Sequence, residues 1–462
     1  MMIRLLIILC LMLSTPAWSA TYYVATTGTD GAAGTIGAPW RTIQYGVNQL
    51  VAGDTLIIRD GTYVEDTNGI VINTADGTVG SRITIQAENQ HAAILSSTSS
   101  CFPSIDILRS YVTIDGLYLK VDASDVQCTS GTTANYQIHA RPASSPTIGG
   151  TQTTSKKGAW VKNVKMDSPA GHRYAAFKST QDDTIYEYND VYGEAETLNT
   201  NNVIFRYNTV RTDGTATGLL AKGGARNTLI YGNLVYITTA AFSYGIRLGG
   251  CTGDAFFWDT AAKIECYNCA AFSNVVINSN GSSTNRLFQH RSSKDSKIFN
   301  NVGINGVPLE ISRTCATSPP AVADPSFVNN IIVDTPGGTG YSALANTDYS
   351  GTFTHTKNNY YGFTSPPSQT SAVTGDPLFT NIASDWTSQD GSSSIDAGST
   401  VTMPAYGGGS LTVTITKDGA TRAGTWDLGP HEWGGAPPSP PPPPPPPPAG
   451  FGTRGLGLML GK

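Results

Sequence analysis

A single parallel β-helix, an all-β solenoid, is the fold that this 462-residue sequence predicts, and two observations carry the prediction. Tyr, Thr, Asn, Val and Ile recur, whereas Leu- or Ala-rich helical runs are scarce, a composition that favours strands. A short alternating apolar phrase followed by Asn also repeats along the chain, with a period mostly in the twenties. Short strands that repeat at such a period and are joined by Gly-rich turns are typical of stacked coils. We therefore expect one β-helix domain over residues 21–433.

The first 20 residues, MMIRLLIILCLMLSTPAWSA, have the pattern of a secretory signal peptide. Arg4 supplies the charged start, an apolar run follows, and small residues lie near a cleavage site. No later segment approaches the roughly 18 apolar residues that a membrane helix needs. We expect an exported protein, extracellular or periplasmic, that has no transmembrane span and is a monomer.

Residues 40–50, WRTIQYGVNQL, form the one helix that the pattern predicts. A helix at this place would cover the open first coil, whose exposed strand edges would otherwise promote aggregation. At the other end, residues 434–450 are a Pro-rich linker that must be extended polyproline II. Residues 451–462 are too short to fold alone, so we expect a disordered tail, with contact to a surface as the alternative.

The repeated Asn residues predict a hydrogen-bonded ladder along one bend of the solenoid. Stacked coils place equivalent residues about 4.8 Å apart, within reach of one amide to the next. The spacings vary because loops of different length are inserted at the turns. With successive spacings of 19, 25, 41, 27, 29 and 29 residues, the ladder is expected to comprise Asn189, Asn208, Asn233, Asn274, Asn301, Asn330 and Asn359.

Six cysteines follow the signal segment, and an even number in an exported chain favours disulfides. Cys266 and Cys269 form a CxxC pair, but no second CxxC or His pair lies nearby, so zinc is the weakest interpretation, behind free buried thiols. The sequence leaves the pairing open.

The net charge of −5 conceals an asymmetry. Residues 156–313 carry 17 Lys and Arg against 13 Asp and Glu, whereas the remainder carries 12 against 21. A basic middle section can attract a polyanion, and a solvated face is the plain alternative. An acidic, exported chain without aromatic-basic motifs argues against nucleic acid as the partner.

The stretch GLLAKGGARNTLIYGN, residues 218–233, places a cationic turn between two strand-like pieces. Because alternate residues of a strand point to opposite faces, Lys222 and Arg247 are expected on one outer face of adjacent coils. Aligning the coils on their Asn residues sets His290 beneath Lys222 and Lys294 beneath Arg226.

The same alignment turns Glu194 and Glu196 of YGEAETLN inward, unless the register slips or both carboxylates line a turn. Further residues are expected to contact such a polyanion on this face, namely Arg226, Arg286, Arg291, Lys294 and Tyr244.

The opening phrases YYVATTGTD and GAPWRTIQYGVNQLVAGDTLIIRDGTYVE resemble the N-terminal cap and first coil of secreted bacterial right-handed β-helix proteins of the pectate-lyase-like superfamily. The later phrases DPLF, SIDAG and DLGPHEW resemble the way many such chains end. The resemblance covers roughly residues 21 to 433 and implies a right-handed parallel β-helix, although a fold does not fix a function.

Residues 193–250 resemble, more loosely, the polysaccharide lyases that include chondroitinase B and calcium-dependent alginate lyases. GEAE stands near the acidic calcium-binding strand of those enzymes, LAKGG near their Arg-His-Gly turn, and GIRLGG matches their Gly-Ile-Arg phrase. Two departures are the absence of a lysine in TLNTNN and the Lys222-Gly223-Gly224 sequence of the turn.

This resemblance implies β-elimination in an acidic polysaccharide, in which a cation neutralises the uronate carboxylate and a base removes the C5 proton. Lys222 is the expected base, provided that neighbouring cations depress its pKa, and Arg247 the neutralising cation. Arg226 and His290 are expected to assist, while Glu194 and Glu196 are expected to bind Ca²⁺.

Two other classes of function stay open. A non-catalytic carbohydrate-binding or adhesin-type β-helix would leave these residues scattered rather than convergent. A glycoside hydrolase needs two carboxyl groups about 5–9.5 Å apart. Glu194 with Asp213, or Asp254 with Glu265, could supply them.

Overall fold

The computed structural model describes residues 19–432, except for residues 65–68, 98–104, 122–135, 143–155, 168–174, 213–216, 239–241, 254–256, 258–260, 314–319, 336–343, 405–409, 413–414 and 423. The predicted signal peptide up to residue 18, the Pro-rich linker and the tail lie outside the described residues.

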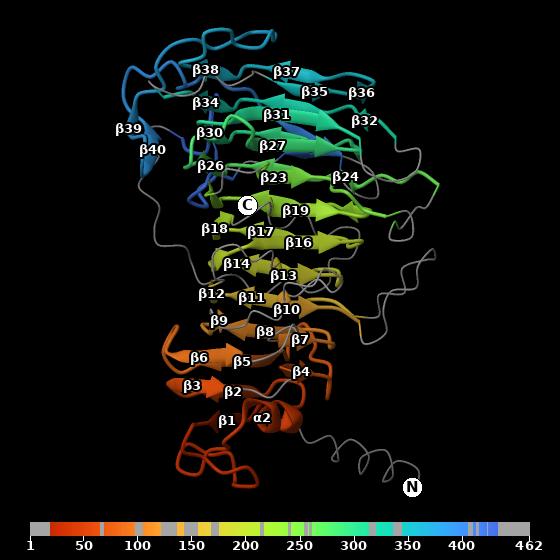
Figure 1. The fold of residues 1–462 in the computed structure, drawn as a ribbon, viewed down its shortest axis with the longest axis vertical. Coiled ribbons are helices and arrows are strands. Elements are labelled where there is room, and N and C mark those ends of the chain that lie inside the picture. The colour runs from red at the N-terminus through yellow and green to blue at the C-terminus, as the bar shows by residue number, and fades with distance from the viewer. Residues whose placement is uncertain are drawn as a thin grey trace, which may run out of the picture.

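The described chain is a parallel β-helix, as predicted, in which equivalent strands of successive coils stack into long parallel sheets (Figure 1). Sheet A has 12 strands: β1 (Thr21–Val24), β2 (Thr55–Ile58), β5 (Ile83–Ala87), β8 (Val112–Asp115), β11 (Trp160–Lys162), β14 (Ile185–Glu187), β17 (Ile204–Arg206), β21 (Leu229–Tyr231), β25 (Ala270–Phe272), β29 (Lys297–Phe299), β33 (Ser326–Val328) and β37 (Thr354–Thr356). Sheet B has 10 strands: β4 (Ile70–Ile72), β7 (Ile105–Ile107), β10 (Tyr136–Ala140), β13 (Ala175–Ser179), β16 (Glu194–Leu198), β19 (Thr217–Lys222), β23 (Tyr244–Leu248), β27 (Arg286–Arg291), β31 (Val307–Ser312) and β35 (Ala345–Thr347).

Two further parallel sheets complete the coils. Sheet C has 11 strands: β3 (Gly61–Val64), β6 (Ala93–Ser97), β9 (Tyr118–Val121), β12 (Lys165–Asp167), β15 (Asp190–Tyr192), β18 (Thr209–Thr212), β22 (Leu234–Ile237), β26 (Val275–Asn278), β30 (Val302–Ile304), β34 (Ile331–Val333) and β38 (Asn359–Tyr361). Sheet D has five short strands at the bend between sheets B and A: β20 (Ala225–Arg226), β24 (Cys266–Tyr267), β28 (Ser293–Lys294), β32 (Val322–Ala323) and β36 (Tyr349–Ser350).

Alternation along each short strand builds the core. In β2 the residues Leu56 and Ile58 are buried, while the two residues between and before them are partly exposed. Inward residues of neighbouring sheets then meet inside the coil, where the rings of Phe177 on sheet B and Tyr186 on sheet A stack with centroids 4.4 Å apart. Each coil therefore buries one side of its strands in the core and turns the other side outward.

The Asn ladder runs along the bend between sheets A and C. Each side-chain amide donates to the side-chain oxygen of the next rung at 2.9–3.0 Å, from Asn189 through Asn330. The predicted ladder is confirmed for six rungs, but the seventh is wrong by one residue. Asn358, not Asn359, accepts from Asn330 at 2.9 Å, and Gln369 then accepts from the amide of Asn358.

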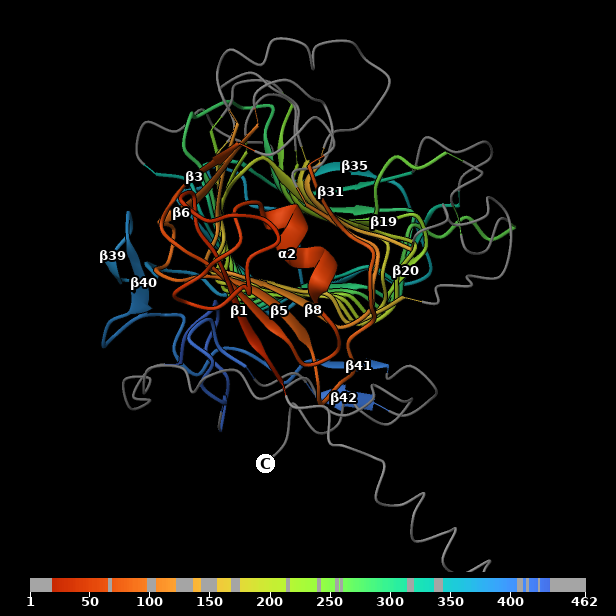
Figure 2. The same cartoon turned by 90° about the horizontal axis from the view of Figure 1, so that it is seen from below.

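The predicted N-terminal helix is confirmed as α2 (Ile43–Gln49), which lies across the open first coil (Figure 2). The side chain of Thr42 caps it by accepting a hydrogen bond from the Tyr45 amide. Ile43 and Val47 face the coil, and Gly46 approaches Leu56 so closely that a Cβ there would meet it at 3.0 Å. Among the described residues, no helix has the length and apolarity that crossing a membrane requires.

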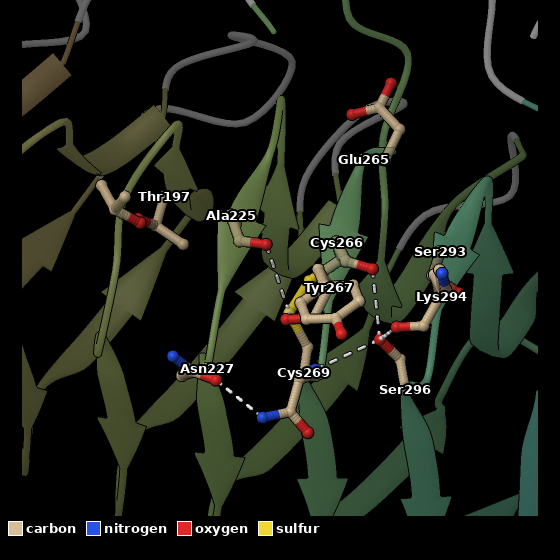
Figure 3. The surroundings of a disulfide bond; sticks show 12 residues. Thr197, Ala225, Asn227, Glu265, Cys266, Tyr267, Cys269, Ser293, Lys294 and Ser296 are labelled. Atoms are coloured by element: carbon tan, nitrogen blue, oxygen red, sulfur yellow. Dashed lines mark hydrogen bonds between the residues drawn. A yellow bond between two sulfur atoms is a disulfide. The ribbon is translucent and has the colours of Figure 1, made fainter. Parts of the chain in front are cut away.

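Disulfides are present, in agreement with the prediction. Cys266 on β24 and Cys269, just before β25, are joined inside the coil with their Cα atoms 6.1 Å apart (Figure 3). Cys251 is disulfide-bonded as well. Cys101, Cys128 and Cys315 lie outside the described residues.

The segment after β38 packs against the outside of the coils. It contains the antiparallel pairs β39 (Phe379–Asn381) with β40 (Asp385–Ser388) and β41 (Thr402–Pro404) with β42 (Ser410–Thr412). Trp426 and Met403 join an apolar cluster with Phe272 on sheet A, and Trp386 joins another with Ile304 on sheet C. Figure 2 shows β39–β40 beside sheet C and β41–β42 beneath sheet A. These two sheets are therefore covered in their last coils.

Candidate functional site

The outer face of sheet B carries a continuous line of mostly polar side chains, here called the outer column. Its members occupy one register position on eight successive strands: Asp106, His139, Lys178, Glu196, Leu220, Arg247, Gln289 and Glu310. Neighbouring strands lie about 4.8 Å apart, so each side chain is within reach of the next. Polar groups therefore follow the length of the solenoid on this sheet.

The centre of the outer column is Glu196, a carboxylate held between two lysines. Its Oε2 lies 2.5 Å from Lys222 Nζ, and its Oε1 lies 3.0 Å from Lys178 Nζ. Tyr136 donates its hydroxyl to Oε1 at 3.3 Å and accepts a hydrogen bond from Lys178 at 2.6 Å. Burial opposes the charge of Glu196, but the ammonium groups of Lys222 and Lys178 outweigh it and lower the pKa of Glu196.

Glu194 lies beside this group, and its pKa is shifted in the opposite direction to that of Glu196. Burial and the charge of Glu196 raise the pKa of Glu194 to about 7, against the opposing effect of Lys222. Glu194 hydrogen-bonds to Glu196, and its Oε2 accepts the backbone N–H of Thr217 at 3.1 Å. Two carboxyl groups with separated pKa values mark a place where a proton can be held or released near neutral pH.

Arg247 lies two strands further along the outer column and is only 8% exposed. Its Nε donates to Gln289 Oε1 at 2.6 Å, its Nη1 donates to Thr217 Oγ1 at 3.1 Å, and its guanidinium lies 4.3 Å from the centre of the Tyr244 ring. Burial lowers the pKa of Arg247, and its Nη2 has no hydrogen-bond partner among the described residues. Arg286, on the next strand from Tyr244, pairs with Glu310 at 2.9 Å.

Several sequence predictions are confirmed in their geometry. Lys222 and Arg247 lie on the same outer face of adjacent strands. Arg226 and Lys294 occupy one register position on sheet D, with Tyr267 on the strand between them, around the bend from Lys222. Arg291 ends β27 and donates to the carbonyl of Arg313 at 2.8 Å.

Of the alternatives left open for Glu194 and Glu196, the structure shows that the register slips by one residue. Ala195 pairs with Leu219 and Glu196 with Leu220, so Glu196 points outward instead of into the core. The cause is the bend after Lys222, where Gly223 and Gly224 both have positive φ. Because Leu198 pairs with Lys222 and Asn201 with Arg226, this bend contains one residue more than the bend of the previous coil.

The same extra residue overturns the placement of His290. It pairs with Leu248, which pairs with Ala221, so His290 points into the core and is fully buried. Its Nδ1 lies 3.0 Å from Ser293 Oγ and its Nε2 lies 3.3 Å from the Ser326 carbonyl oxygen. Burial lowers the pKa of His290 to about 4. His290 is a core histidine, away from the outer column.

Lys222 was expected to act as a base only if its pKa were depressed, and this arrangement does not depress it. Burial acts against the charge of Lys222, but Glu196 and Glu194 outweigh it and raise its pKa. Lys222 is therefore a stable ammonium group. Tyr136 and Lys178 belong to no motif in the sequence. Lys178 has an outward position on β13, but strict alternation from the buried Ile138 would turn Tyr136 inward, and the register shifts between Ala175 and Phe177, next to Tyr136.

Glu194 and Glu196 do not fit the predicted Ca²⁺ site in this arrangement. Calcium prefers six to eight oxygen ligands, and both oxygens of Glu196 are already engaged by ammonium groups. One oxygen of Glu194 is engaged as well, because it accepts the backbone N–H of Thr217. In the part of the chain that the structure describes, no group of three or more His, Cys, Asp or Glu side chains is arranged to hold a metal ion.

The described chain is thus a parallel β-helix that carries an Asn ladder along one bend and a line of mostly polar side chains on the outer face of one sheet. Residues 22–168 match the family model described as the Pel9A-like, right handed beta helix region. A 77-residue segment is 38% identical to pectate lyase PEL9 of Emericella nidulans, a match that spans 17% of this chain and 18% of that relative.

Solved structures share the same fold. A rhamnogalacturonan lyase superposes with a TM-score of 0.50 at 15% identity, covering 79% of this chain and 91% of its own. The pectate lyase Pel9A also superposes with a TM-score of 0.50, at 13% identity, covering 90% of this chain and 97% of its own. The predicted resemblance to right-handed pectate-lyase-like β-helix proteins is thus confirmed for the fold.

Proposed function

We propose that this protein is an exported polysaccharide lyase that cleaves uronate-containing chains by β-elimination at the centre of the outer column. The observation that carries the proposal is the Lys178–Glu196–Lys222 group on an outer sheet face, with Glu194 beside it. Two cations and a carboxyl group that titrates near neutral pH are the parts that this reaction needs. The β-helix region of the Pel9A-like kind and the structural likeness to lyases agree with this class.

Each residue has a role set by its charge. Lys178 and Lys222 bind and neutralise the uronate carboxylate, for which they exchange their contact with Glu196. Glu194 takes the C5 proton, a C4–C5 double bond forms, the C4–O4 bond breaks, and the leaving oxygen takes a proton from water. This assignment moves the base from Lys222 to Glu194, because Lys222 has a raised pKa whereas that of Glu194 is about 7.

A hydrolase that uses the same carboxyl pair is disfavoured by the geometry. Glycosidases hold their carboxyl groups about 5–9.5 Å apart across one bond, whereas Glu194 and Glu196 share a hydrogen bond. The other pairs weighed from the sequence involve Asp213 and Asp254, which lie outside the described residues. A buried disulfide agrees with an exported protein, since such bonds persist in oxidising compartments.

The test is the ultraviolet absorbance of the unsaturated uronate that only elimination creates, measured on alginate, pectate, chondroitin sulfate and heparin. We expect absorbance to rise on one polymer, and Glu194→Gln to lower kcat by about 10²- to 10⁴-fold, the usual contribution of a positioned base. Glu187→Gln is the control, because Glu187 is a fully buried carboxylate that pairs with Arg206 on sheet A, away from the outer column. A flat trace on all four polymers would overturn the proposal in favour of a carbohydrate-binding protein.

The pH dependence gives a second check on Glu194. A base must be deprotonated, so kcat/KM should rise with pH through about 7 and level off above it. An activity that already reaches its plateau below pH 5 would exclude Glu194 as the base.

A further inference from the structure

The loop and bend on either side of Lys222 meet at one buried carboxylate, that of Glu265. This side chain lies just before β24, has no exposed surface, and takes no part in the roles proposed above. Its Oε2 accepts the backbone N–H of Gly223, the residue after Lys222, at 2.7 Å. The backbone carbonyl of Glu265 also accepts the N–H groups of Gly224 at 3.0 Å and Ala225 at 3.2 Å.

The same carboxylate holds the loop that follows β23. Thr252 donates its backbone N–H to Glu265 Oε1 at 2.8 Å and its hydroxyl to Oε2 at 2.7 Å. Within this loop Gly250 lies directly against the stem of Lys222, because a Cβ at Gly250 would meet Lys222 Cβ at 2.8 Å and Cδ at 2.9 Å. The loop therefore forms one wall along the lysine, and Glu265 fastens it to the bend.

The position of Glu265 is itself fixed by covalent and backbone bonds. Cys266 follows it directly and is cross-linked to Cys269, while Ala225 and Cys266 occupy one register position on neighbouring strands (Figure 3). A buried carboxylate with three donors from two separate segments is costly to desolvate unless every bond is kept. This arrangement resists relative movement of the bend and the loop.

We infer that Glu265 is a positioning residue for Lys222, which acts by fastening the bend at Gly223 to the loop that flanks the lysine stem. The inference rests on the proposed function for its catalytic consequence. Lys222 can reach Glu196 at 2.5 Å only while its backbone and its stem keep this geometry. Small displacements of a reacting group commonly lower a rate by about 100-fold.

Glu265→Gln tests the inference, because glutamine keeps the size of the side chain but replaces one acceptor oxygen with a donor. Two readouts are needed. The first is limiting acetylation of Lys222 by acetic anhydride, mapped by mass spectrometry relative to the exposed Lys294. We expect Lys222 to react slowly in the wild type, since its pKa is raised, and several-fold faster in Glu265→Gln. The second readout is elimination activity, with kcat expected to fall about 10- to 100-fold.

Controls separate positioning from a general loss of structure. Glu187→Gln removes another fully buried carboxylate, on sheet A, and should leave the acetylation of Lys222 unchanged. If Glu265→Gln does not fold, Thr252→Val removes one donor without changing the side-chain shape, and should give a smaller shift in the same direction. Gly250→Ala should move the lysine stem directly and raise acetylation with the Glu265 bonds intact.

Unchanged acetylation of Lys222 in Glu265→Gln and Thr252→Val would overturn the inference. If the wild type eliminates no polymer, the proposed lyase function fails while the acetylation result still decides whether Glu265 fixes Lys222. If acetylation rises but kcat of an active enzyme is unchanged, Glu265 fixes Lys222 without a catalytic consequence, and the positioning role in catalysis is excluded.

Discussion

Glu194 and Glu196 are two residues apart on one strand, yet their pKa values shift in opposite directions. Glu196 is buried and Glu194 is half-buried, and loss of contact with water raises the pKa of both carboxyl groups. Glu196 touches two ammonium groups that more than compensate for this, whereas Glu194 touches Glu196 and a backbone amide. Glu196 therefore keeps its charge and Glu194 can exchange a proton near neutral pH. The lysines that cause this difference come from the strands on either side, β13 and β19.

The buried His290 predicts how the free energy of unfolding depends on pH. Its pKa in the folded protein is about 4, below the ordinary value of 6.5, because burial disfavours the charged ring. As the pH falls below 6.5 the unfolded chain takes up a proton that the folded chain refuses, so stability is full above about pH 6.5 and declines down to about pH 4. A shift of this size corresponds to about 3 kcal/mol.

The measurement is the urea midpoint of wild type and His290→Gln at pH 7, 5.5 and 4. The wild type should lose stability faster than the variant, since only the wild type has this histidine to titrate. Equal losses in the two proteins would show that His290 is protonated in the fold.

Elements were easier to predict than the site, for a physical reason. The period, the apolar alternation and the Asn residues are local patterns, so coils, cap helix and ladder follow from them. The outer column depends on the exact length of every bend, and one additional residue between Lys222 and Arg226 changes which face carries Glu196 and His290. Tyr136 and Lys178 could not be assigned for the same reason, since they reach Glu196 only through the stacking of three coils.

The Asn ladder predicts a large cost for a single buried rung. Asn274 accepts from the backbone N–H and the side chain of Asn233, and its own amide donates to Asn301. Asn274→Ala leaves these buried groups without partners, at about 1–3 kcal/mol each, so we expect a loss of at least 3 kcal/mol in the free energy of unfolding. Asn48→Ala, at an exposed position of α2, should change stability by no more than about 0.5 kcal/mol. Similar midpoints for both variants in urea would contradict a stabilising ladder.

Loss of the disulfide is expected to lower the free energy of unfolding by less than loss of an Asn rung. Cys266 and Cys269 close a loop of only four residues, for which chain entropy gives about 2 kcal/mol. The next coil has Ser293 and Ser296 at the matching places, so serine fits this bend without a cross-link. The double variant Cys266→Ser, Cys269→Ser should fold and lose about 2 kcal/mol by thermal or urea unfolding. A failure to fold would show that the cross-link contributes far more to stability than the chain entropy of its loop.

At the scale of the whole molecule, the position of the site follows from what the C-terminal segment covers. In the last coils the outer faces of sheets A and C carry apolar clusters that Trp386, Met403, Trp426 and Leu428 of the C-terminal segment join. Sheet B instead presents the outer column, whose charges would be costly to bury under an apolar segment. The C-terminal segment therefore covers sheets A and C and leaves sheet B, with the outer column, uncovered in the described chain.

The covered face of sheet A should contribute to stability and not to activity on sheet B. Trp426 is 4% exposed and packs on Phe272 and Phe299 of sheet A, with the guanidinium of Arg422 against its ring. Trp426→Ala should cost about 3–5 kcal/mol, as large-to-small changes in packed clusters do, and should increase binding of an apolar dye. Leu378→Ala, in the same segment but 37% exposed, is the matched control and should lose far less. Because Trp426 packs on sheet A, both variants should retain elimination activity when it is measured well below the melting temperature. A loss of kcat in Trp426→Ala alone would mean that the covering segment also shapes the site on sheet B.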